Sequence, residues 1–148
     1  MKKIDIFTDG ACSGNPRPGG WAAILRYKGY EKKISGFVAN TTNNRMELLA
    51  LINALSLLKQ KCEINIFTDS KYVADSISNG WALNWKKENW RKKNKKVPNA
   101  DLWDILLGLV ERHIVNINWV RGHNGHLENE ECDKMAVDEI KKQKGKYV

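Results

Sequence analysis

The amino-terminal part of the chain alternates between short hydrophobic segments and polar turns. Three segments are rich in β-branched and aromatic residues and are separated by Gly-containing turns, which is the pattern of β-strands. They are Lys3–Thr8, Trp21–Tyr27 and Lys32–Val38. Their close succession along the chain predicts an antiparallel meander of three strands.

The pattern changes in residues 43–58, which are apolar on nearly every face of a helix and contain no Pro or Gly. This predicts a helix buried against a sheet. Later segments predict strands at Ile64–Thr68 and Val115–Val120, and helices at Ser70–Ser78, Ala100–His113 and Glu128–Lys142. The alternation predicts an α/β fold: a five-stranded mixed sheet, made of the meander and two parallel strands, with helices on both faces.

Residues 80–99, called the basic segment below, do not follow either pattern. Three Trp residues stand there among cations: Trp81, Trp85 and Trp90, with Lys86, Lys87, Arg91, Lys92, Lys93, Lys95 and Lys96. Aromatic rings that stack on bases and cations that neutralise phosphates are what nucleic-acid binding requires. The alternative is a solvated loop that its Trp side chains anchor to the core.

Composition supports a polyanionic partner and an intracellular setting. The 148 residues suit one domain, and the formal net charge is +8. Cys12, Cys62 and Cys132 are too few and too scattered for a disulfide framework or a thiolate zinc site. Neither a signal-peptide core nor an apolar run of membrane-spanning length is present. We therefore expect a cytoplasmic protein with no membrane association.

A local repeat carries the first candidate chemistry. The segment Ile4–Gly10 reads IDIFTDG and the segment Ile64–Ser70 reads INIFTDS, so both predicted strands end on an aspartate, Asp9 and Asp69. If the strands are parallel neighbours, these carboxylates lie side by side at one edge of the sheet, where they repel each other unless a cation binds between them. Mg²⁺ is the expected ion, with Mn²⁺ as the alternative. The simpler interpretation is that Asp69 caps the next helix with Ser70 and that Asp9 serves a turn.

Two further acids are less clearly marked. Glu47 is placed in the first turn of an otherwise apolar helix, where a charge needs a partner. A helix cap built from Asn44–Glu47 explains it equally well. Asp133 lies among Glu128, Glu130 and Glu131, and acids on such a helix usually form a solvated face. Its spacing alone does not select it.

Residues 122–125 and His126 form a Gly-flanked loop after the last predicted strand, and His123 in this loop could handle protons. A zinc site made by His123 and His126 is the alternative. No thiolate or third histidine lies nearby in the sequence to complete it.

Taken together, the motifs closely resemble bacterial type I ribonuclease H over nearly the whole chain. The matching segments are Thr8–Cys12, Gly14–Pro16, Asn43–Glu47, Thr68–Ser70, Asp101–Trp103, Gly122–His123 and Asn129–Asp133. The resemblance implies the ribonuclease H-like fold. It also implies an endonuclease that hydrolyses the RNA strand of RNA–DNA hybrids, with little sequence specificity.

The resemblance also assigns roles to residues. It implies that Asp9, Glu47, Asp69 and Asp133 bind two Mg²⁺ ions, of which one activates the attacking water and the other stabilises the leaving 3′ oxygen. The products would carry 5′-phosphate and 3′-hydroxyl ends. His123 matches a histidine thought to assist proton transfer or product release, and Glu130 matches an acid near the second metal.

Substrate contacts follow in the same way. Residues expected to line the RNA strand are Cys12, Gly14, Asn15, Asn43, Asn44 and Ser70. Thr42 and Asn99 match a pocket for a DNA phosphate. Trp81, Trp85, Lys86 and Lys87 belong to a segment that resembles the basic protrusion that holds the DNA strand. Lys71 departs from the family, whose members often carry Gln there. A monomer without an obligate protein partner is expected.

Overall fold

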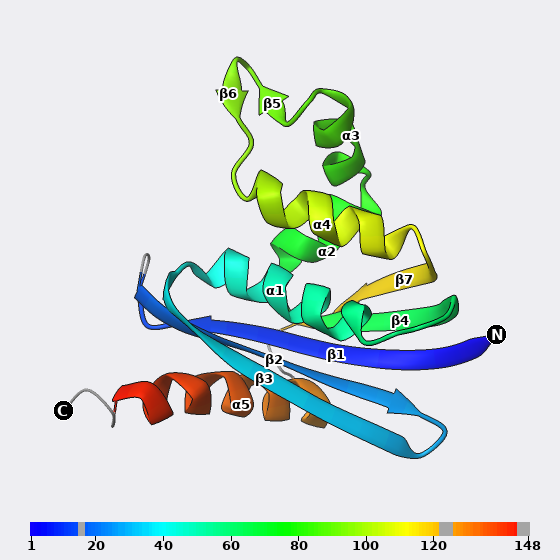
Figure 1. Cartoon of the computed structure of the whole chain (residues 1–148), viewed down its shortest axis with the longest axis vertical. Coiled ribbons are helices and arrows are strands. Elements are labelled where there is room, and N and C mark those ends of the chain that lie inside the picture. Colours follow the sequence, from blue (N-terminus) through cyan, green and yellow to red (C-terminus); the bar gives the residue numbers. More distant parts are fainter. Residues whose placement is uncertain (15–16, 122–125, 145–148) are drawn as a thin grey trace.

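The computed structural model describes residues 1–14, 17–121 and 126–144. Its main sheet has five strands in the order β3-β2-β1-β4-β7 (Figure 1). The strands are β1 (Lys2–Cys12), β2 (Arg17–Tyr27), β3 (Tyr30–Thr41), β4 (Cys62–Thr68) and β7 (Ile114–Trp119). β1, β2 and β3 form an antiparallel meander, while β4 is parallel to both β1 and β7. The predicted mixed sheet is confirmed.

Helices cover both faces of this sheet. They are α1 (Asn43–Ser56), α2 (Lys71–Ser78), α3 (Trp81–Lys87), α4 (Ala100–Val110) and α5 (Leu127–Lys144). Figure 1 shows α1, α2 and α4 on one side and α5 on the other. None of the described helices is both long enough and apolar enough to cross a membrane.

The alternation of side chains along β1 explains why a hydrophobic core lies on each face of the sheet. Ile4 and Ile6 face the larger core, where they pack with residues of α1 and α4 that include Leu51 and Trp103. Phe7 faces the other way and packs in a smaller core with Ala136 of α5. Successive residues of a strand point to opposite faces, so one strand serves both cores.

Two glycines let helices lie directly against strands. A Cβ atom at Gly10 of β1 would lie 2.6 Å from the backbone nitrogen of Glu47 in α1. A Cβ atom at Gly20 of β2 would collide with the backbone oxygen of Ala136 in α5. Any larger side chain would push the helix away from the sheet.

The basic segment has more structure than its sequence pattern indicated. It contains α3 and a small two-stranded sheet of β5 (Arg91–Lys92) and β6 (Lys95–Lys96). Lys93 and Asn94, between these strands, have positive φ values of 51° and 63°. A sequence so rich in Lys and Trp has no clear hydrophobic periodicity, and a turn through positive φ without glycine gives little signal.

Candidate active site

Parallel pairing of β1 and β4 brings Asp9 and Asp69 together, as the repeated sequence predicts. The register pairs Thr8 with Thr68, so the two aspartates follow paired residues. β4 ends at Thr68, whereas β1 continues to Cys12, so only one of the two strands ends where the repeat indicated. Asp9 is therefore part of a strand and does not belong to a turn.

A buried amide joins the two strands where they separate. Asn129 of α5 is fully buried, and its Nδ2 donates hydrogen bonds to the backbone oxygens of Thr8 at 3.3 Å and Phe67 at 3.0 Å. These oxygens lie one and two residues before the aspartates. The first turn of α5 thereby fixes the strand ends that carry Asp9 and Asp69.

Glu47 approaches these acids from α1. The helix begins at Asn43, so Glu47 lies in its second turn, and the predicted position in the first turn is wrong. The cap explanation fails as well, because Thr42 is the N-cap and its side chain accepts from the backbone N–H of Arg45. Glu47 Oε1 instead accepts from the backbone N–H of Gly10 at 3.1 Å, and only 3% of the residue is exposed.

Asp9, Glu47 and Asp69 form one carboxylate group, called the acid triad below. Each offers an oxygen, and these oxygens all lie within 4.8 Å of one another. Burial and then the charge of Glu47 raise the pKa of Asp9, and burial and then the charge of Asp69 raise the pKa of Glu47. A divalent cation would lower these pKa values again, because it favours the ionised form of every carboxylate around it. The donor set therefore fits a hard metal ion.

Asp133 lies at the margin of the triad. It is half-buried on α5, and its charge contributes to the raised pKa of both Asp9 and Glu47. Among the residues that the structure describes, the set of carboxylate oxygens that all lie within 4.8 Å of one another comes from the triad and does not include Asp133. Glu130, on the same helix, is exposed.

The other residues expected near the RNA strand lie at the ends of β1 and the starts of two helices. Cys12 is half-buried, and its Sγ donates to the backbone oxygen of Gly14 at 2.6 Å. Asn43 and Asn44 are exposed in the first turn of α1, and Ser70 caps α2 by accepting from the backbone N–H of Val73. Asn15 and His123 lie outside the described residues.

Asn99 belongs to a polar network between α1, α2 and α4. Its Oδ1 accepts from Arg45 at 3.4 Å, and its Nδ2 donates to the hydroxyl of Tyr72 at 3.4 Å. Arg45 also donates two hydrogen bonds to Asp101, at 2.7 and 2.9 Å. Asn99 and Asn44 line one pocket of about 510 Å³ together with lysines of the basic segment. The remaining phosphate-pocket residue, Thr42, is half-buried at the start of α1.

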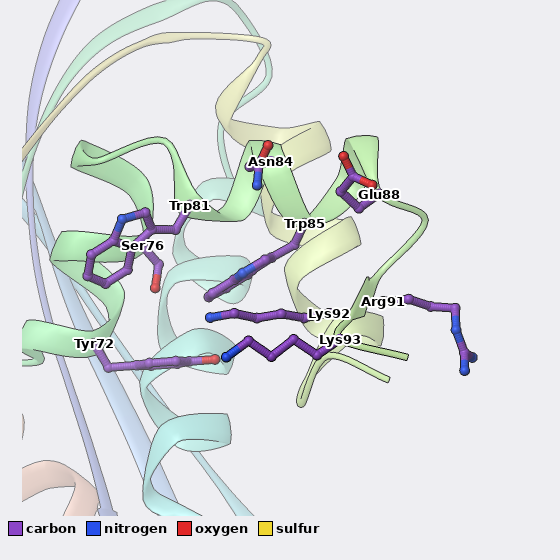
Figure 2. A pocket seen from close by; sticks show the side chains of 9 residues that line it. All are labelled: Tyr72, Ser76, Trp81, Asn84, Trp85, Glu88, Arg91, Lys92 and Lys93. Atoms are coloured by element: carbon purple, nitrogen blue, oxygen red, sulfur yellow. The ribbon is translucent and has the colours of Figure 1, made fainter. Parts of the chain in front are cut away.

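Of the two roles considered for the Trp residues of the basic segment, the structure shows the anchoring one. Trp85 packs edge-on against the buried Trp103, with ring centres 6.0 Å apart, so it anchors the segment to the core. Trp81 is 47% exposed. Both rings line a second pocket, in which Figure 2 shows Lys92 and Lys93 extending below Trp85 toward Tyr72. Lys86 and Lys87 are exposed on α3.

Sequence reasoning missed the residues that hold the site in place. Asn129 appeared only as part of a motif, and a lone Asn in an acidic helix gives no sign that it is buried. Tyr72 accepts a hydrogen bond from Trp103 Nε1 at 2.7 Å and so links α2 to α4. Gly10 could have been found, because a glycine next to a candidate metal ligand indicates close backbone approach.

Comparison with known proteins places this geometry in a family. The family model described as RNase H matches residues 1–141. A ribonuclease H of Rhizobium johnstonii is 58% identical over 137 residues, which cover 92% of this chain and 90% of the relative.

Solved structures agree. LC9-RNase H1, a type 1 RNase H with the type 2 active-site motif, superimposes with a TM-score of 0.85 at 29% identity, covering 97% of this chain and 74% of that one. LC11-RNase H1, solved in complex with an RNA/DNA hybrid, gives a TM-score of 0.74 at 21% identity, covers 95% of this chain and 98% of that one, and shows the shared fold. The sheet, the acid triad and these matches together show that the chain belongs to the ribonuclease H family.

Proposed function

We propose that this protein is an endonuclease that hydrolyses the RNA strand of RNA–DNA hybrids with little sequence preference, leaving 5′-phosphate and 3′-hydroxyl ends. The observation that carries the proposal is the acid triad, in which Asp9 and Glu47 are buried and Asp69 is half-buried, in a chain with a strongly basic segment. Family membership and the hybrid complex of LC11-RNase H1 support the choice of substrate.

The triad, joined by Asp133, would hold two Mg²⁺ ions, with Mn²⁺ as a possible substitute. When bound, the ions supply an activated water and stabilise the charge that develops on the leaving 3′ oxygen. The chain itself positions the carboxylates: Gly10 orients Glu47 through its N–H, and Asn129 fixes the strand ends before Asp9 and Asp69. His123 is proposed to assist proton transfer or product release.

Two sets of residues are proposed to bind the hybrid, one set for each strand. The RNA strand would lie on Cys12, Gly14, Asn15, Asn43, Asn44 and Ser70. The DNA strand would lie on Thr42, Asn99, Trp81, Trp85, Lys86 and Lys87. The pocket shared by Asn44, Asn99 and the lysines of the basic segment supports this arrangement, because it lies between the two sets. Contacts of this kind reach the backbone and do not read bases, which accounts for low sequence preference.

We further propose that the protein acts as a single catalytic domain, as a cytoplasmic monomer.

Cleavage of defined duplexes tests the function. The protein is incubated with Mg²⁺ and a hybrid labelled on its RNA strand, and in parallel with duplex RNA, duplex DNA and single-stranded RNA. We expect cleavage of the hybrid RNA alone, with 5′-phosphate ends. Equal cutting of duplex DNA would favour a DNA-processing relative, and binding without cutting would favour a catalytically silent hybrid-binding protein.

A pair of substitutions on one strand makes the test specific to the triad. Asp9→Asn should abolish cleavage while hybrid binding remains measurable. Asp5→Asn is the matched control, because Asp5 lies on the same strand and, among the residues that the structure describes, its carboxylate accepts only a long hydrogen bond, 3.4 Å, from Asn65. It should keep nearly full activity. Activity that persisted in Asp9→Asn would contradict the proposed site.

A further inference from the structure

Trp119, the last residue of β7, is attached to the acid triad through the backbone. Strand pairing places it beside Thr68, and the backbone N–H of Val120 donates to Thr68 O at 2.8 Å. The indole Nε1 of Trp119 then donates to the backbone oxygen of Asp69 at 3.1 Å. One triad residue is thus held by a side chain from the neighbouring strand.

The ring of Trp119 is unusual in its surroundings. The residue is 45% exposed, and its indole N–H already donates to a backbone oxygen. A large aromatic side chain normally gains stability by burial. This ring is held in a fixed orientation with much of its surface in contact with solvent, next to the residue that we propose binds metal.

Lys71 completes the arrangement. It is exposed at the first position of α2, and its Nζ lies 5.5 Å from the centre of the Trp119 ring, within the range of a cation–π contact. A positive charge at a helix N-terminus opposes the helix dipole. In the part of the chain that the structure describes, no carboxylate forms an ion pair with this lysine. Helix stability therefore does not account for its position.

We propose that Lys71 and Trp119 form a subsite for the RNA strand, in which Lys71 binds a backbone phosphate and Trp119 is the positioning residue that holds both Lys71 and Asp69. The inference rests on the proposed function. Asp69 belongs to the triad that cuts RNA, so the strand that reaches Lys71, two residues further on, is the strand being cut. An ammonium group on an ordered ring is suited to neutralising a phosphate.

This subsite is made by different elements from the basic segment. Lys71 and Trp119 come from α2 and β7, whereas the basic segment consists of α3, β5 and β6. The subsite and the basic segment can therefore be tested separately, because each would neutralise its own phosphates. Each would then make its own contribution to the salt dependence of binding.

Binding without cleavage tests the lysine. Affinity for a fluorescent hybrid is measured in EDTA at several salt concentrations, for wild type, Lys71→Gln and the control Lys59→Gln, an exposed lysine near the opposite ends of the strands. With one phosphate fewer neutralised, the slope of log affinity against log salt should fall by about 0.7 to 0.9. Between 50 and 200 mM salt, wild type should lose about threefold more affinity than Lys71→Gln. Lys59→Gln should behave as wild type.

A chemically altered hybrid identifies the strand. A single uncharged methylphosphonate linkage is placed at successive positions of the RNA strand, and in a second series along the DNA strand. At one RNA position the linkage should weaken binding by wild type and leave Lys71→Gln unaffected. Sensitivity shared by both proteins at every position, or a difference found only in the DNA series, would overturn the proposal.

Substitutions of Trp119 test the positioning role. Trp119→Phe keeps a ring under Lys71 but removes the N–H donor to Asp69, so kcat should fall while the salt slope of binding stays near that of wild type. Trp119→Leu should lower kcat and flatten the slope as well. Equal kcat in wild type and Trp119→Phe would overturn the role at Asp69, and melting temperatures show that each variant is folded. Failure of wild type to cleave RNA would instead count against the proposed function, since the binding measurements do not depend on cleavage.

Discussion

Glu47 Oε1 accepts a hydrogen bond from the backbone N–H of Gly10 at 3.1 Å, which links the second turn of α1 to the middle strand of the sheet. The bond is possible because Gly10 has no side chain to separate the helix from the strand. The orientation of Glu47 and the close packing of α1 against β1 therefore both depend on Gly10.

Gly10→Ala should disturb both. The new Cβ would lie 2.6 Å from the backbone nitrogen of Glu47, so α1 must move. We expect a loss of about 1 to 3 kcal/mol in the free energy of unfolding, as for other overpacked sites. Hybrid cleavage should fall with it. Gly108→Ala is the control, because nothing lies within 4 Å of its Cβ position in α4, and it should stabilise the protein by about 1 kcal/mol. Denaturant unfolding with equal effects of the two substitutions would contradict the packing argument.

Removal of metal should expose the repulsion within the triad. In EDTA, Asp9→Asn should be more stable than wild type by about 1 to 3 kcal/mol, which corresponds to one or two pKa units of relieved repulsion. Mg²⁺ should raise the melting temperature of wild type, because it binds only the folded triad. It should have little effect on Asp9→Asn. A wild-type melting temperature that did not respond to Mg²⁺ would count against a metal site.

The pH dependence of stability should have an unusual sign. Burial and the neighbouring carboxylates raise the pKa of Glu47, so the folded chain keeps a proton that the unfolded chain releases near pH 4. Stability without metal should therefore decline as pH rises above this value. Melting temperatures in EDTA from pH 5 to 8 should fall more steeply for wild type than for Glu47→Gln. Glu111→Gln, at an exposed site, should follow wild type.

Neutralising the basic segment should weaken binding in a salt-dependent way. The quadruple variant Lys86→Gln, Lys87→Gln, Lys92→Gln and Lys93→Gln should reduce the salt slope by about 0.9 for each phosphate that these lysines neutralise in the wild-type complex. The control carries the same charge change at exposed lysines elsewhere: Lys28, Lys32, Lys59 and Lys61. If both variants changed the slope equally, general charge would explain binding and the segment would have no specific role.

Asn129→Ala tests the amide that joins β1 and β4. The buried backbone oxygen of Thr8 and the part-buried one of Phe67 would lose this donor, which should cost about 2 to 4 kcal/mol. Activity should fall further than stability explains, because the strand ends that carry Asp9 and Asp69 would separate. Asn53→Ala removes a hydrogen bond to Leu49 within α1 and should stay within about 0.5 kcal/mol of wild type. Normal activity in Asn129→Ala would show that the strands keep their positions without the amide.

Sequence patterns predicted most of the sheet, because strand periodicity and the repeated IDIFTD and INIFTD segments are local signals. The sequence analysis placed Asp9 beside Asp69 on the condition that the two strands are parallel neighbours, and the observed register of β1 and β4 meets that condition. The capping box considered at Asn44 would have put Glu47 in the first turn, whereas the actual N-cap is Thr42, two residues earlier, so Glu47 lies in the second turn. Element ends depend on individual capping bonds, which a hydrophobic pattern does not contain.

Contacts between distant segments could not be predicted in this way. The burial of Asn129 depends on how α5 docks, and the attachment of Trp119 to Asp69 depends on the pairing of β7 with β4. Asp133 could be selected only through family resemblance. Its place at the margin of the triad agrees with the weak local signal that it gave.

The order in which the chain is synthesised has a consequence for the amide of Asn129, which joins β1 and β4. Asp9, Glu47 and Asp69 are synthesised first, and the helix that carries Asn129 is made after all three of them. A nascent chain therefore contains all three acids of the triad before it has the amide that joins their strands. We therefore expect the triad to reach its final geometry only after the first turn of α5 has been synthesised and has docked on the sheet.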